Sequence, residues 1–200
     1  MPCNKKIILS LVAVLFIGVI KVSVCHSFTL LTKEQALKEI FGRDSEIVTE
    51  TQRLRGVALE RVRERLGGKL VYEQVGSESE KVIEQKTVEF NFFVKDGIKV
   101  AVAIIDVEPG RWGPVEFITA IDLGSTPKVK RVEVMSYQEK RGRPIARRSF
   151  MKQYEGKSTR DPLEVGKDIT GVSGATISSR AATFTVKKAL VIVEECLLKN

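Results

Sequence analysis

The sequence predicts an α+β domain built mainly on an antiparallel sheet, with helices before the sheet and one long helix after it. Two helical patterns occur before residue 67, four strand patterns lie between residues 87 and 137, and a long amphipathic pattern ends the chain. A chain of 200 residues that is 43% hydrophobic and 29% charged has enough apolar material for one core. We expect residues 28–84 to pack as an N-terminal region on a domain formed by residues 85–200.

Residues 1–27 have the layout of a secretory signal peptide. Two lysines precede the apolar run Ile7–Ile20, which is short for a bilayer span, and a cleavage site fits after Ser27. Two alternatives remain open: an uncleaved anchor that continues past Lys21, and a lipoprotein modified at Cys25. Each interpretation places the body of the protein in the periplasm or on the extracellular face of the cytoplasmic membrane.

Histidine and cysteine usage excludes several kinds of chemistry. The one histidine is His26, inside the leader, which argues against Ser-His-Asp and Cys-His catalysis and against histidine-ligated metals. The three cysteines, Cys3, Cys25 and Cys196, form no CxxC pair, which argues against zinc ribbons and iron–sulfur clusters. We therefore predict no metal site. Cleavage of the leader would leave Cys196 alone, so no internal disulfide is expected.

Two short helices and a strand are predicted after the leader. Thr32 and Gln35 fit a capping box, and apolar residues at helical spacing continue to Phe41, where a glycine follows. Glu46–Thr51 has a brief strand character. Val57–Leu66 is helical in pattern and is followed by two glycines.

The middle of the chain changes to the period of strands. The patterns cover Leu70–Val75, Thr87–Val94, Ile98–Val107, Val115–Leu123 and Val129–Tyr137. A Lys-Asp-Gly turn joins the second and third of these as a hairpin. In the last, Val132 and Val134 alternate with Arg131 and Glu133, as expected of an antiparallel strand with one buried face.

The C-terminal part is predicted to contain a short helix, a loop and the long helix. The short helix covers Arg147–Tyr154, and Gly156–Gly171 is a polar loop. The long helix carries an apolar stripe formed by Ala182, Val186, Ala189, Leu190, Val193 and Leu197.

The net charge of +8 is unevenly distributed. Three of the positive charges belong to the leader, and five more, with no acidic residue among them, lie within residues 140–148. This segment is either a solvated surface or a local site for an anionic group. An export leader and the absence of interleaved aromatic residues argue against nucleic acid as the partner.

The segment before the long helix is the most informative part of the sequence. Residues 170–179 read TGVSGATISS, so glycine and small hydroxylated residues lead into a helix N-terminus. Thr176 and Ser178 are both candidate N-caps. Free N–H groups and the helix dipole favour a phosphate there, and Gly174 permits close approach. On local chemistry alone, an ordinary capped turn is the alternative.

This segment resembles the flavinylation motif of the FMN-binding domain family, which includes the flavin-bearing C subunit of the sodium-pumping NADH:quinone reductase and the G subunit of the Rnf complex. The resemblance implies that an FAD-dependent flavin transferase links FMN through its phosphate to Thr176. The neighbouring motif residues implied to surround the FMN are Ser173, Gly174, Ala175, Ile177 and Ser178.

Upstream segments extend the resemblance to about residues 85–195. Residues 137–142, YQEKRG, are similar to the family's Y-x-E-x-x-G segment, and 147–150 and 153–157 are similar to the basic helix and loop that follow. By this resemblance Glu139 hydrogen-bonds the flavin or lines its pocket. On electrostatic grounds, Arg147 and Arg148 are expected to stabilise reduced, anionic flavin. Tyr137 either packs against the flavin ring or is a core tyrosine.

One position departs from the family pattern. Family members usually carry an acidic residue six positions before the modified threonine, where this chain has Thr170. Asp168 lies two residues away and is the candidate substitute if the loop shifts. Slow flavinylation and non-covalent FMN are the alternatives that this departure leaves open.

The function expected from these patterns is that of an exported flavoprotein with covalent FMN. It would act as an electron-transfer carrier or subunit in a membrane-associated redox chain, rather than as a stand-alone enzyme. A threonine hydroxyl is a weak nucleophile, and a body without histidine supplies no obvious base, so attachment needs the external transferase. The expected partners are that transferase and a membrane redox complex or cytochrome. The alternative function is a non-flavinylated binding module that recognises an anionic surface or partner.

Overall fold

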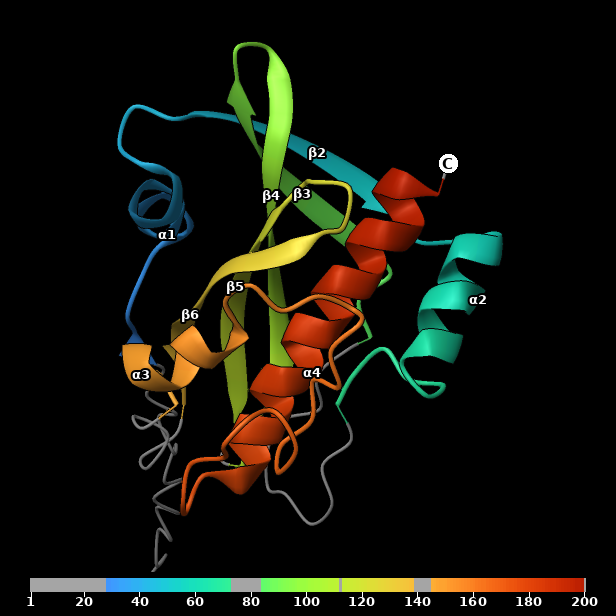
Figure 1. Ribbon diagram of the computed structural model, residues 1–200. Coiled ribbons are helices and arrows are strands. Elements are labelled where there is room, and N and C mark those ends of the chain that lie inside the picture. Colours follow the sequence, from blue (N-terminus) through green and yellow to red (C-terminus); the bar gives the residue numbers. More distant parts are fainter. Residues whose placement is uncertain (1–27, 73–83, 112, 139–144, 200) are drawn as a thin grey trace, which may run out of the picture.

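A computed structural model of the chain contains one antiparallel sheet of six strands in the order β1-β6-β5-β4-β3-β2. It describes residues 28–72, 84–111, 113–138 and 145–199, so the leader and Glu139 lie outside the described residues. The strands are β1 (Phe28–Thr29), β2 (Glu46–Arg53), β3 (Thr87–Lys95), β4 (Ile98–Pro109), β5 (Pro114–Asp122) and β6 (Lys128–Tyr137). The strongly twisted sheet curls around the long C-terminal helix (Figure 1).

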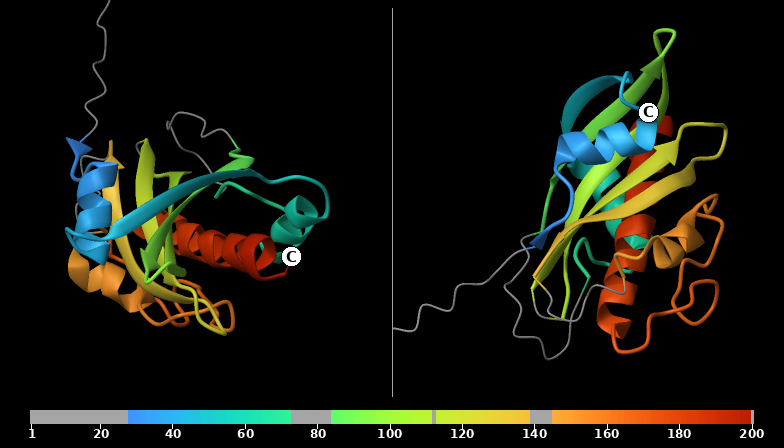
Figure 2. Two further views of the ribbon diagram at one scale, coloured as in Figure 1. Left: turned by 90° about the horizontal axis from the view of Figure 1, so that it is seen from above. Right: turned by 90° about the vertical axis from the view of Figure 1, so that its left-hand side faces the viewer.

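The helices lie on both faces of this sheet. They are α1 (Lys33–Phe41), α2 (Gly56–Arg65), α3 (Arg148–Met151) with a 3₁₀ turn (Lys152–Tyr154), and α4 (Thr176–Val193) with a π-helical turn (Glu194–Leu198). Figure 2 shows α1 on one face and α4 on the other. The predicted α+β class, the antiparallel sheet and the C-terminal helix are therefore confirmed. No helix among the described residues is both long and apolar enough to cross a membrane.

Alternation along β6 shows how the two faces are filled. Val132 and Val134 lie in the main core beneath α4, whereas Met135 lies in a second, smaller core beneath α1. Glu133 is only 9% exposed, so its face is covered more fully than the predicted alternation of buried and solvated residues implied. The physical reason is that α1 packs over this face of the sheet.

Local signals place α1 correctly. The N–H of Gln35 donates to the Thr32 hydroxyl (3.2 Å), and the N–H of Thr32 donates to the Gln35 side chain (2.9 Å), which completes the capping box. Gly42 follows the helix with φ of 107°, a conformation that favours glycine.

Two elements differ from the prediction. The two-residue strand β1 pairs with β6, an edge contact too short to leave a pattern in the sequence. Leu70–Tyr72 form no strand, and the rest of the predicted Leu70–Val75 lies outside the described residues. The Leu70 carbonyl accepts a hydrogen bond from the buried Lys188, and the Tyr72 N–H donates one to the buried Glu108, so these two backbone groups have partners without a neighbouring strand.

A buried cluster of charges fastens α4 to β4. The ammonium of Lys188 lies 2.5 Å from Asp106, contacts Glu108, and donates to the carbonyl of Leu70 at 2.8 Å. The second Glu108 oxygen accepts the Tyr72 N–H at 2.7 Å. Asp106 and Glu108 are two residues apart on one strand, so both point toward α4. The cluster therefore joins the helix, the sheet and the segment 70–72.

Burial sets the ionisation of this cluster. Burial and the neighbouring Asp106 raise the pKa of Glu108 to about 7, although Lys188 opposes the shift. Burial by itself lowers the pKa of Lys188, but the two carboxylates outweigh it and raise that pKa above its usual range. Lys188 therefore keeps its charge, and the pKa values of both carboxyl groups, Asp106 and Glu108, are raised above their ordinary values.

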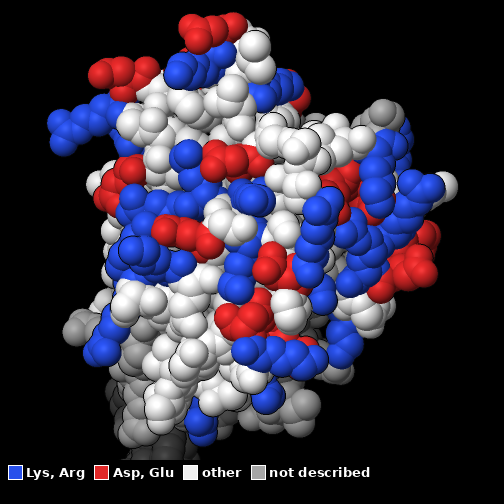
Figure 3. All heavy atoms as spheres, in the orientation of Figure 1, with Lys and Arg blue, Asp and Glu red and all other residues white. Residues whose placement is uncertain are grey.

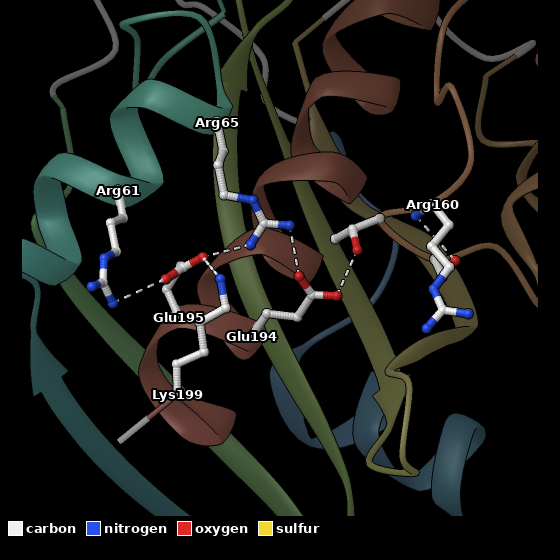
Figure 4. A network of polar contacts seen from close by, with 8 residues as sticks. Arg61, Arg65, Arg160, Glu194, Glu195 and Lys199 are labelled. Carbon is white, nitrogen blue, oxygen red and sulfur yellow. Dashed lines mark hydrogen bonds and ion pairs between the residues drawn. The ribbon is translucent and has the colours of Figure 1, made fainter.

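A second set of ion pairs, partly buried, holds α2 against the C-terminal end of α4. The Arg65 guanidinium bonds to Glu194 at 2.6 Å and to Glu195 at 2.7 Å (Figure 4). Glu195 also pairs with Lys199 at 2.6 Å. The carboxylates thus neutralise Arg65 and fix the C-terminal end of α2.

We predict that Lys188→Met destabilises the fold by about 3–5 kcal/mol, because it leaves two carboxylates buried without their cation. The measurement is the free energy of unfolding in urea. Lys187→Met is the matched control: Lys187 is half-buried and forms no ion pair with any described residue, so we expect a change within about 0.5 kcal/mol. Equal unfolding midpoints for the two variants would contradict the anchoring role.

Candidate functional site

The glycine- and serine-rich segment leads into α4 as predicted, but the helix is capped differently. Ala175 is the N-cap and Thr176 the first helical residue, and no side chain caps the helix. The expectation that Thr176 or Ser178 is the N-cap is therefore wrong. The physical reason is that Ser179 binds the loop instead, through the Val172 N–H. Ser178 is buried inside the helix packing, with only 1% of its surface exposed.

Ser179 fastens the loop to the first turn of α4. Its hydroxyl accepts the Val172 N–H at 3.0 Å and donates to the Ala175 carbonyl at 2.9 Å. The side chain is fully buried. These two hydrogen bonds to the backbone hold the segment between Val172 and Ala175 as a closed turn, and so fix the position of Thr176.

The turn presents an accessible hydroxyl. Ser173, Gly174 and Thr176 are exposed, and Ile177 is half-buried. No described residue forms a hydrogen bond with the Thr176 hydroxyl. Gly174 has φ of 76°, which a side chain would strain, and open space surrounds it. The first turn of an α-helix has N–H groups without intrahelical partners, so the exposed hydroxyl lies beside donors suited to a phosphate.

The loop before this turn is held by two side chains. Gln153 accepts the Thr170 N–H at 2.8 Å and donates to the Thr170 carbonyl at 3.2 Å. The carboxylate of Asp168 pairs with Lys157 at 2.9 Å and accepts the N–H groups of Leu163 and Glu164. Burial raises the pKa of Asp168, but these partners outweigh it and lower that pKa below its ordinary value. Asp168 thus stabilises the loop in which it lies.

Other predicted site residues lie elsewhere. Tyr137 is 4% exposed in the main core and its ring stacks on Phe28 at 5.8 Å, which supports its interpretation as a core tyrosine. Arg148 contacts Glu155 and lies 3.8 Å from Glu133, whose side chain faces α1. The structure therefore holds Arg148 toward the face opposite α4 and does not bring it to Thr176.

Arg147 is exposed and occupies the N-cap position of α3, without a side-chain capping bond. The predicted role of Glu139, like that of the basic residues 140–143, concerns positions outside the described residues.

A groove of about 430 Å³ runs beside α4 and was not foreseen from the sequence. Three segments form it: α4, the loop 162–165, and the C-terminal end of α2 together with Tyr72. Its α4 wall consists of Arg180, Thr183, Phe184 and Lys187. Helical spacing from Thr176 to these residues was visible in the sequence, but the opposite walls come from distant segments that spacing does not reveal.

Residues 110–191 match the FMN-binding domain family. The match begins at the β4–β5 turn and ends near the end of α4, and it includes the whole turn before Thr176. The resemblance inferred from the sequence motifs is thus confirmed over these residues.

Among solved structures, the chain is similar to the crystal structure of Shewanella oneidensis NqrC, with 16% sequence identity and a TM-score of 0.48. The similarity covers 80% of this chain and 88% of that one. The sequence has no match among the curated proteins.

We predict that Ser179→Ala loosens the turn before α4, because the Val172 N–H loses its acceptor. The expected loss is about 1–2 kcal/mol in the free energy of unfolding, with faster hydrogen exchange at the Val172 amide measured by NMR. Ser173→Ala, at an exposed position of the same turn, is the control and should leave both quantities unchanged. An unaltered Val172 exchange rate in Ser179→Ala would refute the proposed fastening.

Proposed function

We propose that this protein carries FMN joined through its phosphate to the Thr176 hydroxyl and serves as an exported electron carrier in a membrane-associated redox chain. The observation that carries the proposal is the exposed Thr176 hydroxyl on the first turn of α4, within the residues that match the FMN-binding domain family.

The residues around Thr176 fit an attached phosphate. The N-cap residue Ala175 makes no side-chain bond to the first turn, and the positive end of the helix dipole favours a negative group. Ser173 and Gly174 leave the approach to the hydroxyl open. FMN attached there supplies the redox chemistry, while the chain holds its phosphate and limits where the rest of the molecule can lie.

Attachment requires a second enzyme. No described residue contacts the Thr176 hydroxyl as a base, and a threonine hydroxyl is a weak nucleophile by itself. With FAD as the donor, the Thr176 oxygen forms a bond to the FMN phosphorus, the diphosphate bond of FAD breaks, and AMP leaves. The hydroxyl proton passes to a base of the transferase. The closed turn held by Ser179 gives that enzyme a fixed substrate.

Export and the redox partners are also part of the proposal. Two lysines followed by the apolar run Ile7–Ile20 support export by a signal peptide or retention by an N-terminal anchor. A flavin outside the cytoplasm needs an electron donor and an acceptor there, and a membrane redox complex or cytochrome suits that role.

The test is co-expression with an FAD-dependent flavin transferase, followed by denaturing electrophoresis and flavin fluorescence in the gel. The wild-type band is expected to fluoresce in the membrane or periplasmic fraction. Thr176→Val should abolish the signal, because valine keeps the shape and lacks the oxygen. Thr126→Val, in the turn between β5 and β6, is the matched control and should keep it. Wild-type protein without bound flavin would overturn the proposal, and fluorescence confined to the cytoplasm would overturn export.

A further inference from the structure

We propose that Lys188, Asp106 and Glu108 form a buried proton-binding site, in which the two carboxyl groups share one proton and release it when the pH rises. The inference does not depend on the flavin. The cluster contains one ammonium and two carboxyl groups, so without a proton it carries a net charge of −1 inside the protein. One proton taken from water removes that net charge.

The three side chains are almost completely excluded from water. Glu108 is 0% exposed, Lys188 5% and Asp106 7%. On β5, Val115 lies opposite Glu108 in the register of the sheet. Phe117 lies opposite Asp106, and both apolar residues are fully buried. A carboxylate in such surroundings loses the hydration that it has at the surface, which favours its neutral, protonated form.

One cation serves both acids. The Lys188 ammonium lies 2.5 Å from Asp106 and contacts Glu108, and it also donates to a backbone carbonyl. The second Glu108 oxygen accepts the Tyr72 N–H at 2.7 Å. The second Asp106 oxygen accepts the Val107 N–H at 3.0 Å. These neutral donors stabilise the carboxylates but do not supply the missing positive charge, which a proton would supply.

The other groups around the cluster are uncharged. A cavity of about 20 Å³, large enough for one water molecule, adjoins Asp106 and Lys188. Its remaining polar lining residues are Gln85 and Thr87. The Tyr72 side chain is the titratable group that the segment 70–72 brings to α4, and its ring packs beside that of Phe184. No other charged side chain among the described residues forms an ion pair with the cluster.

The arginines of α2, which packs beside α4, have carboxylate partners of their own. Arg63 pairs with Glu84. Arg65 bonds to Glu194 and Glu195. Figure 3 shows acidic and basic side chains intermixed over this face of the molecule. The charge balance of the cluster therefore depends mainly on its own three groups.

Proton binding at this site has a defined effect on stability. Burial raises the pKa of Glu108 to about 7 and raises the pKa of Asp106 above its ordinary value. A carboxyl group in the unfolded chain releases its proton at a lower pH. The folded protein thus keeps a proton that the unfolded chain has lost, which stabilises the fold. This contribution is fully present below the ordinary carboxyl pKa and is lost as the pH rises through about 7.

Exposed carboxylates with cationic partners act in the opposite direction. Lys38 lowers the pKa of Glu34, and Lys33 lowers that of Glu89. The stability that these pairs contribute is lost only as the pH falls below the ordinary carboxyl range. A loss of stability on raising the pH from about 5 to about 7 is therefore a distinct property of the buried cluster.

Two backbone amides allow the site to be titrated directly. The Tyr72 N–H donates to Glu108, and the Val107 N–H donates to Asp106. In an NMR titration of the full chain, the shift of one or both amides is expected to follow a single proton with a midpoint near 7. Constant shifts between about pH 5 and about pH 9, or a midpoint in the ordinary carboxyl range, would overturn the proposal.

The variant Glu108→Gln keeps the size of the side chain and an oxygen for the Tyr72 N–H, but it cannot titrate. Between about pH 5.5 and about pH 8, the unfolding constant in urea should rise on the order of tenfold more for the wild type than for Glu108→Gln. Glu46→Gln, at an exposed position of β2, is the matched control and should behave as the wild type. Equal pH dependence in the wild type and Glu108→Gln would contradict the proposal. If Glu108→Gln does not fold, the amide titration of the wild type decides the question.

Discussion

The ion cluster of Lys188, Asp106 and Glu108 is the constraint on which the rest of the site depends. Taking three charged groups out of water is costly, and the cost is offset only when their geometry and hydrogen bonds are complete. Here the lysine has two carboxylates and a carbonyl as partners, and one carboxylate also binds a backbone N–H. The position of α4 along β4 is thus specified more sharply than apolar packing alone would specify it.

Two features of the molecular surface follow from that position. At its N-terminal end, α4 presents Thr176 beyond a turn that Ser179 holds closed. Along its exposed side, the helix forms one wall of the groove, and the same cluster holds Tyr72 on the facing wall. A single anchoring contact therefore positions both Thr176, the proposed attachment point, and the groove. Such preorganisation suits a carrier whose cofactor must be held while electrons enter and leave.

Short-range signals in the sequence predicted most of the fold. The capping box at Thr32, the hairpin turn at Lys95–Gly97 and the antiparallel strand β6 depend on residues a few positions apart, and the structure has them as expected. The amphipathic stripe likewise predicted α4. In contrast, Lys188 and Asp106 are far apart in the sequence, and a lysine within an apolar helix gives no sign of its partners.

The sequence predicted the place of Thr176 at the start of α4, and it predicted less well where the other candidate residues lie. The motif located Thr176 because its neighbours in sequence are also its neighbours in space. Arg148 shows the opposite case: its ion pairs hold it toward the α1 face, and a basic pattern carries no information about direction. Ser179 was overlooked because capping rules favour the residue before the helix, whereas here a residue of the first turn binds back to the loop.

Peptide mapping by mass spectrometry tests the central claim most directly. Cleavage after Lys167 and Arg180 yields a peptide of residues 168–180 that contains Thr176 and no other candidate attachment region. In protein co-expressed with a flavin transferase, fragmentation of this peptide is predicted to place FMN, as a phosphate ester, on Thr176. An unmodified peptide, or FMN on a different residue, would contradict the account.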